Sequence, residues 1–438
     1  MSERDGESGR RLRIKVWHVV LALIVVLAGL TALHLRWSKR SVERRLEALR
    51  AAGYPTSLAE LREYHKLPAG VPNAADLYTQ AFAAFMLPPD ANSSFWGMAG
   101  LPERGEPLSD LTSRLISESL AENQQCLALL RQAGAIEQCR YDWDLTKPLP
   151  DSTILGDCSR LLQFAALLHA HQGRVEEALA CIKDGLRLGE SMRRQPLAIS
   201  QTVRSYNDGK ALRALERVLC RVVLTDRQLL ELDGMVATIA DNLDFADTMI
   251  TERGLMLGNC RAALAGPRGD FNLRMMILSL PGGKSRTFRD ILDRMGACVD
   301  AARLPETQRL ARFRQIRKEV ESLSDLHAII KDLMPVMSPI AELDLLFRAH
   351  LRLVRTALAL ERYRLATGKL PPDLEALVPQ YLEQTPTDPF DGQPIRYRRT
   401  TPGYILYSVG RDGQDNGGQE QNDNNRGAPC DLCFIVTR

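Results

Sequence analysis

LGDCSRLLQFAALLHAHQGRVEEALACIKDGLRLGESM, residues 155–192, is the stretch that decides the fold. Apolar residues recur at about every third or fourth position in both halves, which is the period of an amphipathic α-helix. Gln172 and Gly173 separate the halves and predict a turn. Small residues stand where two helices must approach closely: Ala166, Ala178 and Gly185. The stretch therefore predicts a helical hairpin and a mainly α-helical fold.

This hairpin resembles one tetratricopeptide unit, with Gly173 in its turn and Ala178 at the packing position between its helices. The resemblance implies a helical-repeat body whose groove binds a peptide. However, the period does not recur convincingly on either side, and a solenoid needs about three repeats to bury a continuous core. An ordinary α-hairpin inside a helical domain is the alternative, and the sequence leaves both open.

Helical periodicity extends over most of residues 41–340, with irregular stretches rich in Pro and Gly at 87–107 and 266–288. The chain has 438 residues, of which 45% are hydrophobic and 25% are charged. This composition is ordinary for a globular protein, and the length predicts more than one domain. We expect residues 41–340 to form an α-helical domain.

VWHVVLALIVVLAGLTALHL, residues 16–35, contains no Asp, Glu, Lys or Arg. At about 1.5 Å per residue, a helix of this length crosses the roughly 30 Å apolar core of a bilayer. A cleavable signal peptide is the alternative, but its apolar region is only about 7 to 15 residues long and ends at a small-residue cleavage site. We therefore expect a retained single-span anchor, with residues 1–15 as a cytoplasmic tail. Basic residues flank both ends of the span, so charge alone does not orient it.

The last part of the chain differs from the helical body. Prolines become frequent: Pro371, Pro372, Pro379, Pro386, Pro389 and Pro394. Short β-like runs follow, namely PIRYRR, GYILYSV and LCFIV. We expect residues 341–438 to form a separate α+β module. The predicted fold class is mainly α with a C-terminal α+β module that contains a small antiparallel β domain.

Several pieces of this module occur in a distinctive order. LERYRLATGKLP is followed by LEALVPQYL, by a P-x-D-P-F-x-G-x-P-I-x-Y run and by Y-S-V-G-x-D-G. This order resembles the C-terminal domain of the major pseudopilin, the G-like protein of bacterial type II secretion systems. The resemblance covers only the C-terminal part of the chain. It implies a location in the cell inner membrane, with the bulk of the chain outside the cytoplasm.

The resemblance also implies a structural Ca²⁺ ion in the loop after the GYILYSV strand. It places ligands at the carbonyl of Val409 and at the carboxylates of Asp412 and Asp431. Cys430 stands where the family often has a second acid, and a thiol is a poor calcium ligand. The residues that would have to compensate are Asp415, Asp423 or Asn424.

The composition of residues 407–436 allows two interpretations. Residues 407–436 are rich in Asp, Asn, Gln and Gly, and calcium takes about six to eight oxygen ligands from such side chains and from backbone carbonyls. The alternative is a solvated loop, because this composition buries too little apolar surface to order itself. The sequence does not decide between the two.

The N-terminal segment departs from the pseudopilin pattern. RLRIKVWHVVLALIVV, residues 11–26, lacks the glutamate that pseudopilins carry early in their apolar helix, and the C-terminal module lies far downstream of the span. We therefore do not expect an ordinary polymerising pseudopilin. An atypical pseudopilus subunit remains an alternative.

The sequence gives little support for nucleic-acid binding, nucleotide binding or a known catalytic motif. The net charge of +3 gives no basic field for nucleic acid. LPGGKSRT contains Gly-Lys-Ser, but Leu278 occupies the position of the first glycine of a phosphate-binding loop, so no nucleotide is expected. Neither H-E-x-x-H nor G-x-S-x-G occurs. We expect a membrane-anchored, non-enzymatic envelope protein that binds protein partners as a scaffold, linked to a secretion-type apparatus. An extracytoplasmic hydrolase with its site in the helical body is the alternative.

Overall fold

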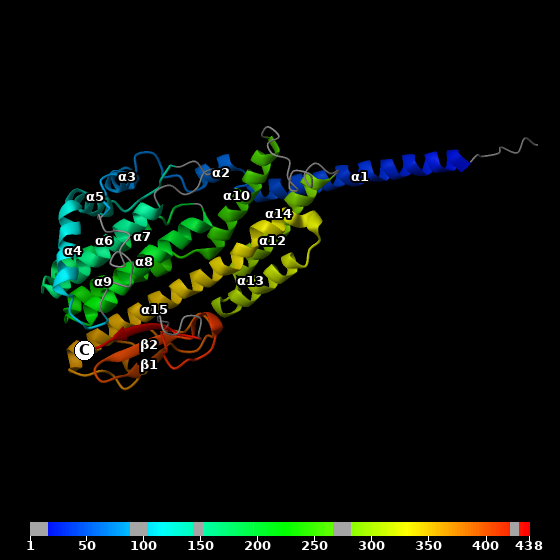
Figure 1. Ribbon diagram of the computed structural model, residues 1–438. Coiled ribbons are helices and arrows are strands. Elements are labelled where there is room, and N and C mark those ends of the chain that lie inside the picture. The colour runs from blue at the N-terminus through cyan, green and yellow to red at the C-terminus, as the bar shows by residue number, and fades with distance from the viewer. Residues whose placement is uncertain (1–15, 88–102, 143–151, 196, 266–281, 421–428) are drawn as a thin grey trace, which may run out of the picture.

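The computed structural model of the protein describes residues 16–87, 103–142, 152–195, 197–265, 282–420 and 429–438 (Figure 1). Over these residues the chain is mainly helical, with one three-stranded antiparallel sheet near the C-terminus. This confirms the predicted class of a mainly α fold with a small C-terminal β part.

The elements of the N-terminal half are α1 (Val16–Ala51), α2 (Leu58–Tyr64), α3 (Ala75–Ala83), α4 (Asp110–Glu122), α5 (Gln124–Gly134), α6 (Ser152–His171), α7 (Val175–Glu190) and α8 (Ala198–Leu219). The helices that follow are α9 (Asp226–Asp241), α10 (Phe245–Ala265), α12 (Gly283–Ala302), α13 (Glu306–Glu321), α14 (Ala328–Leu333) and α15 (Met337–Thr367). The strands are β1 (Arg396–Arg399), β2 (Tyr404–Ser408) and β3 (Leu432–Val436).

Helix α1 is continuous and projects away from the rest of the chain at its N-terminal end (Figure 1). Residues 17–34 are exposed, and an 18-residue window of this helix has a mean hydropathy of 2.3, which is apolar enough to cross a membrane. Further along, Val42 and Leu46 are buried in a core shared with α12, and Arg45 pairs with Asp293 at 2.6 Å. The apolar segment and the charged segment after it are therefore one helix, whose C-terminal part belongs to the helical body.

The helices fill two main hydrophobic cores. One core contains residues of α1, α10, α12, α13 and α14. The larger core contains residues of α3, α5, α6, α7, α8, α9 and α15 together with strands β2 and β3. The sheet thus shares its core with the helical body.

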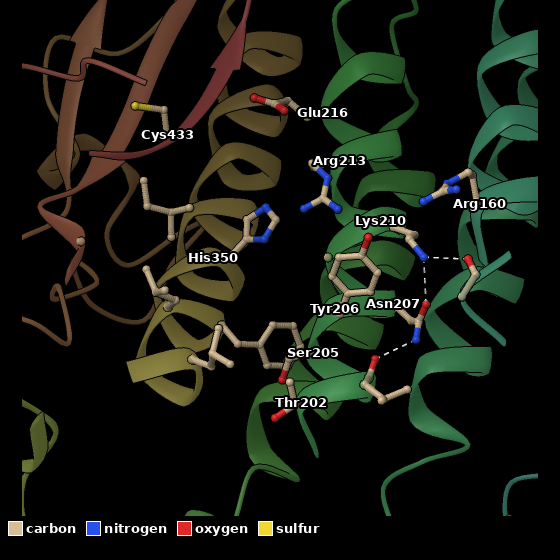
Figure 2. Close-up of a pocket in the computed structure, with 18 of the residues that line it drawn as sticks. Arg160, Thr202, Ser205, Tyr206, Asn207, Lys210, Arg213, Glu216, His350 and Cys433 are labelled. Atoms are coloured by element: carbon tan, nitrogen blue, oxygen red, sulfur yellow. Dashed lines mark hydrogen bonds between the residues drawn. The ribbon is translucent and has the colours of Figure 1, made fainter. Parts of the chain in front are cut away.

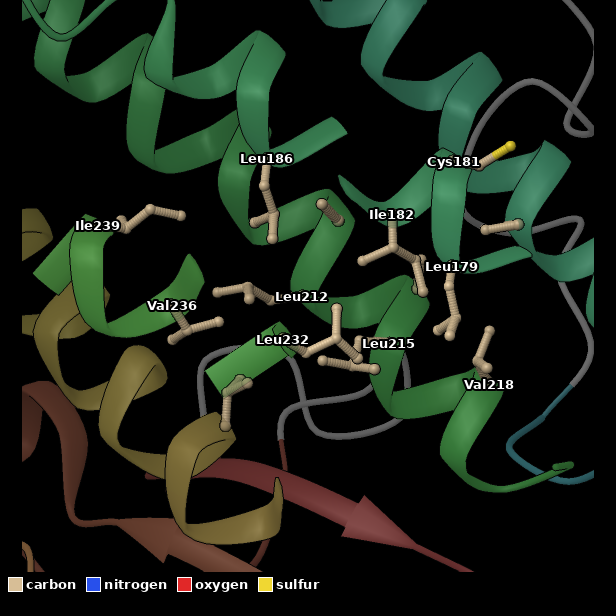
Figure 3. Close-up of a cluster of buried hydrophobic side chains, with 14 of the residues drawn as sticks. Leu179, Cys181, Ile182, Leu186, Leu212, Leu215, Val218, Leu232, Val236 and Ile239 are labelled. Atoms are coloured by element: carbon tan, nitrogen blue, oxygen red, sulfur yellow. The ribbon is translucent and has the colours of Figure 1, made fainter. Parts of the chain in front are cut away.

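Helices α6 and α7 form the predicted hairpin, and Gly173 in its turn has a φ of 73°. Ala166 and Ala178 are fully buried. A Cβ atom at Gly185 would lie 3.1 Å from Cβ of Ala211 in α8, so a small residue is needed there. Apolar side chains of α7, α8 and α9 fill the space between these helices: Leu179, Ile182, Leu212, Leu215, Leu232 and Val236 (Figure 3).

Helix α15 joins the helical body to the sheet. It contacts α8, α9 and α13 as well as β2 and β3. It begins at Met337 and ends before Gly368, which has a left-handed φ of 73° and donates its N–H to the carbonyl of Arg364 at 2.8 Å. The module predicted over residues 341–438 is therefore built around a helix that begins just before its expected boundary.

The sheet has the strand order β1-β2-β3, and both pairings are antiparallel. Tyr404 of β2 lies opposite Arg399 of β1 and Val436 of β3. Tyr404 and Leu406 point into the shared core. Within LPPDLEALVPQYL the chain forms a single 3-10 turn, Glu375–Leu377, since Pro379 cannot donate the N–H that a longer helix would need.

Asp388 links the turn before β1 to the end of β2. Its buried carboxylate accepts hydrogen bonds from the Ser408 hydroxyl at 2.9 Å, the Val409 N–H at 2.8 Å and the Phe390 N–H at 3.0 Å. It also pairs with Arg396 at 3.0 Å. The Asp of the P-T-D-P stretch thus binds the Ser of Y-S-V-G and links the two stretches.

Candidate functional site

A cavity of about 670 Å³ lies where the helical body meets the C-terminal sheet (Figure 2). Its walls come from the start of α6, one face of α8, the first half of α15 and the chain around residues 410 and 430–433. Cavities of this size, formed between helices and lined by both apolar and polar groups, are typical of small-molecule sites.

Helix α8 supplies the polar face of the cavity through Tyr206, Lys210 and Arg213, which are one helical turn apart. Lys210 is only 2% exposed. Its Nζ donates to the carbonyl of Gly156 at 2.6 Å and to Oδ1 of Asn207 at 3.2 Å, and it lies 4.3 Å from the centre of the Tyr206 ring. Burial, together with the nearby positive charges of Arg160 and Arg213, lowers the pKa of Lys210 to about 7.

Arg213 and His350 face one another across the space between α8 and α15 (Figure 2). The Nε of Arg213 is buried without a hydrogen-bond partner, and burial lowers the pKa of its guanidinium group. Burial and the charge of Arg213 lower the pKa of His350 to about 3, so this imidazole is neutral at physiological pH.

The other cations of the cavity wall are paired. Arg104 binds Glu216 at 2.9 Å and Glu420 at 2.6 Å. Arg160 lies 3.8 Å from Asp157, and Arg411 lies 3.5 Å from Glu342 outside the cavity. Within the described chain, Lys210 and Arg213 have no carboxylate at ion-pair distance. Four carboxylates also line the cavity, so what sets the two α8 cations apart is the lack of an ion-pair partner and not a net positive charge.

An apolar wall completes the cavity. It is formed by Val203 of α8 and by Leu343, Leu346 and Phe347 of α15. The ring of Tyr206 is 55% exposed and lies between this wall and the two cations. The arrangement suits a ligand with a negative group and an apolar body.

Glu216 connects the cavity to the sheet. Its buried carboxylate accepts the N–H of Ile435 in β3 at 2.6 Å and pairs with Arg104. Burial raises the pKa of Glu216, while Arg104 lowers it. A ligand that changes the position of α8 would therefore act directly on β3.

The predicted calcium ligands lie beside this cavity. The N–H of Val409 donates to Asp388. Asp412 accepts the N–H of Gln414 at 3.1 Å and the side-chain amide of Asn416 at 3.2 Å. Asp431 accepts the N–H of Asn416 at 3.1 Å, and burial raises its pKa.

Asp412 and Asp431 are thus brought together around Asn416. Asp415 instead accepts the N–H of Gly417 at 2.9 Å and lies 3.7 Å from Arg396. Asp423 and Asn424 lie outside the described residues. In the part of the chain that is described, no group of three or more His, Cys, Asp or Glu side chains could hold a metal ion. The calcium site stays a prediction.

Sequence reasoning missed the residues that form the cavity. Lys210, Arg213 and His350 match no motif, because their partners come from α6, α15 and the sheet, which are distant along the chain. A signal was available in SYNDGKALRALER, where a polar and charged face continues through a helix that is largely buried. That pattern is typical of a helix facing a polar interior.

No family model, no curated protein and no solved structure matches this chain.

Proposed function

We propose that this chain is a membrane-anchored, non-enzymatic binding protein whose cavity receives an organic anion with an apolar body. The observation that carries the proposal is the pair of cations on α8. Lys210 and Arg213 face the cavity without a carboxylate partner, while the neighbouring arginines are paired. An apolar wall lies beside them.

The physical reason is the cost of a buried cation that has no carboxylate partner. Taking a cation out of water costs several kcal/mol unless an anion or a set of hydrogen bonds replaces the water. The lowered pKa values of Lys210 and Arg213 express this cost. A bound carboxylate would remove it, and a planar carboxylate matches the fork of a guanidinium group.

The wider role follows the sequence resemblances. We propose that the chain acts as a scaffold in the cell inner membrane, with its bulk outside the cytoplasm and with protein partners in a secretion-type apparatus. The order of pseudopilin-like pieces supports this, as does the hydrogen bond between Asp388 and Ser408 that links two of them. The tetratricopeptide-like hairpin of α6 and α7 is the proposed surface for a protein partner.

The test of the cavity uses the full chain in neutral detergent and follows thermal unfolding. The probe is 3-phenylpropionate, compared with its uncharged analogue 3-phenylpropanol and with inorganic phosphate. We expect the carboxylate to raise Tm and the alcohol to have little effect. A ligand at a hundredfold excess over Kd stabilises by about 2.7 kcal/mol, which is easily measured.

Two matched variants make the test specific. Arg213→Met removes one of the two unpaired cations of the cavity, whereas Arg227→Met removes an exposed charge on α9. The Tm increase should be lost in the first variant and kept in the second. Equal stabilisation by the alcohol and the carboxylate, or full stabilisation of Arg213→Met, would refute an anion site.

A second candidate function is a hydrolase, and one observation favours it. Lys210 is an amine with a pKa of about 7 inside a cavity, so a large fraction is an uncharged base at neutral pH. Turnover of the p-nitrophenyl ester of 3-phenylpropionate that disappears in Lys210→Met but not in Arg227→Met would support it. Absence of turnover, with binding of the carboxylate, would leave the binding function.

A further inference from the structure

The part of α1 that follows the apolar segment lies beside the start of α12. A Cβ atom at Gly282, next to the start of α12, would lie 2.8 Å from Leu35. Arg289 donates to the hydroxyl of Ser38, and Asp293 pairs with Arg45. These contacts advance together along both helices, so α12 runs in the same direction as α1. The N-terminal end of α12 therefore lies level with the end of the predicted span.

Six exposed or half-buried cations lie at this level. Residues 36–42 of α1 contain Arg36, Lys39 and Arg40, and residues 283–289 of α12 contain Lys284, Arg286 and Arg289. Neither segment contains an acidic residue, although Glu43 and Asp290 follow them directly and Asp290 pairs with His327. We call these six cations the basic collar.

Within the described residues, most of the basic collar has no ion-pair partner. Arg289 binds Ser38, and no ion pair joins any of the other five cations to the described part of the chain. Three cations further from the predicted span form ion pairs. Arg45 pairs with Asp293, Arg50 pairs with Glu60 at 3.0 Å, and Arg294 pairs with Glu319 at 2.8 Å. These three cations are therefore neutralised by carboxylates within the fold, whereas five of the six collar cations have no carboxylate at ion-pair distance among the described residues.

An aromatic residue stands at the same level. Trp37 is 59% exposed, next to the first cation after the apolar segment. Tryptophan prefers the headgroup region of a bilayer, where its ring is partly in lipid and its N–H is in water. Its place beside the basic collar indicates that this level of the molecule meets lipid headgroups.

We propose that the basic collar binds the anionic phospholipid headgroups of the membrane that α1 crosses. The inference rests on the proposed membrane anchoring by α1 and goes beyond the cavity. Headgroup phosphates carry the charge that complements the collar, and a juxtamembrane Lys or Arg contributes about a fivefold gain in affinity for an anionic surface. Because α1 and α12 both supply cations, lipid binding holds the helical body at a set orientation to the bilayer.

The experiment is native mass spectrometry of the full chain in neutral detergent. Phosphatidylglycerol and phosphatidylcholine with the same acyl chains are added in competition, and bound lipids are counted. The test variant carries Lys284→Gln with Arg286→Gln. The matched control carries Lys318→Gln with Lys369→Gln, which removes the same charge from exposed positions on α13 and after α15.

We expect the wild-type chain to prefer phosphatidylglycerol. The preference should fall about 25-fold in the test variant, about fivefold for each of the two cations removed, and stay unchanged in the control. Equal binding of both lipids by an intact chain, or an equal loss in both variants, would overturn the basic collar as a lipid surface. A measured mass that lacks residues 16–35 would instead overturn the membrane anchoring itself, and the collar with it.

Discussion

The Ser408 hydroxyl donates a hydrogen bond of 2.9 Å to Oδ1 of Asp388, and both side chains are completely or almost completely buried. This contact fastens the end of β2 to the turn that precedes β1. The contact holds together two separate pieces of the C-terminal sequence.

We expect Asp388→Asn to destabilise the full chain by about 3 kcal/mol, because an amide cannot accept all the hydrogen bonds made by the carboxylate and leaves Arg396 without its buried partner. Urea unfolding measures the change. Asp412→Asn is the control, because its side chain is exposed and the expected change is within about 0.5 kcal/mol. Equal effects of the two substitutions would contradict the central role of Asp388.

Anion binding in the cavity should depend on pH above about 7. The Lys210 amine loses its proton near pH 7 in the free protein, and a bound carboxylate raises that pKa, so binding takes up a proton at higher pH. The affinity for 3-phenylpropionate should be constant below about pH 7 and fall by up to about tenfold per unit above it. Calorimetry in buffers of different ionisation enthalpy measures the uptake. An affinity that does not change with pH in the wild type would exclude Lys210 as the titrating group. The affinity of Lys210→Arg should not change with pH, because the charge of arginine is permanent.

His350 should make the fold sensitive to acid. The unfolded chain binds a proton at this residue below about pH 6.5, whereas the folded chain does so only near pH 3, so the unfolded state holds more protons between these values. Stability therefore falls on acidification, by up to about 1.4 kcal/mol per unit. Urea unfolding at several pH values should show a smaller loss for His350→Gln. His171→Gln, at an exposed position on α6, should keep the wild-type slope.

Calcium should stabilise the C-terminal loop if the pseudopilin resemblance extends to its ion. Asp412 and Asp431 already converge on Asn416, where an ion would have to displace the present hydrogen bonds. We expect millimolar calcium to raise the Tm of the full chain, chelator to reverse the shift, and Asp412→Ala to abolish it. Asp325→Ala, an exposed acid near α14, is the control. An identical Tm with calcium and with chelator would show that the resemblance is limited to the fold.

Two glycines should respond in opposite directions to the same substitution. A Cβ atom at Gly189 of α7 would lie 1.9 Å from Oδ1 of the buried Asp208, so Gly189→Ala should destabilise by about 2 kcal/mol or more. Gly234 is exposed within α9 with no atom within 4 Å of the added Cβ, so Gly234→Ala should stabilise by about 0.5 to 1 kcal/mol. Thermal unfolding of both variants checks the pair, and a gain in stability for Gly189→Ala would show that α7 and α8 can move apart.

Local patterns predicted local structure well. The turn at Gly173, the buried Ala166 and Ala178, and the apolar segment of α1 follow from spacing along one or two helices. The strands were recognisable for the same reason, because β2 alternates between buried and partly exposed residues. Each of these signals lies within a short stretch of sequence.

The cavity could not be predicted in this way. Lys210 and His350 face the same space only because α15 packs against α8, and Glu216 reaches Ile435 across the same junction. A polar residue on a buried helix face can mean a core hydrogen bond, an ion pair or a binding site. The choice depends on which charges remain unpaired after folding, and that depends on contacts between segments far apart in sequence.

In the proposed membrane-anchored protein, the continuity of α1 also determines how far the sheet stands from the bilayer. The helix has no hinge between Leu35 and Ala51, so this part of it rises about 24 Å from the end of the predicted span. The C-terminal sheet lies at the opposite end of the molecule from the N-terminal half of α1 (Figure 1). With α1 as the proposed anchor, the molecule would hold the sheet at a fixed height above the membrane, because no flexible linker joins α1 to the helical body. A second protein in the same membrane reaches the sheet only if its own soluble part extends to the same height.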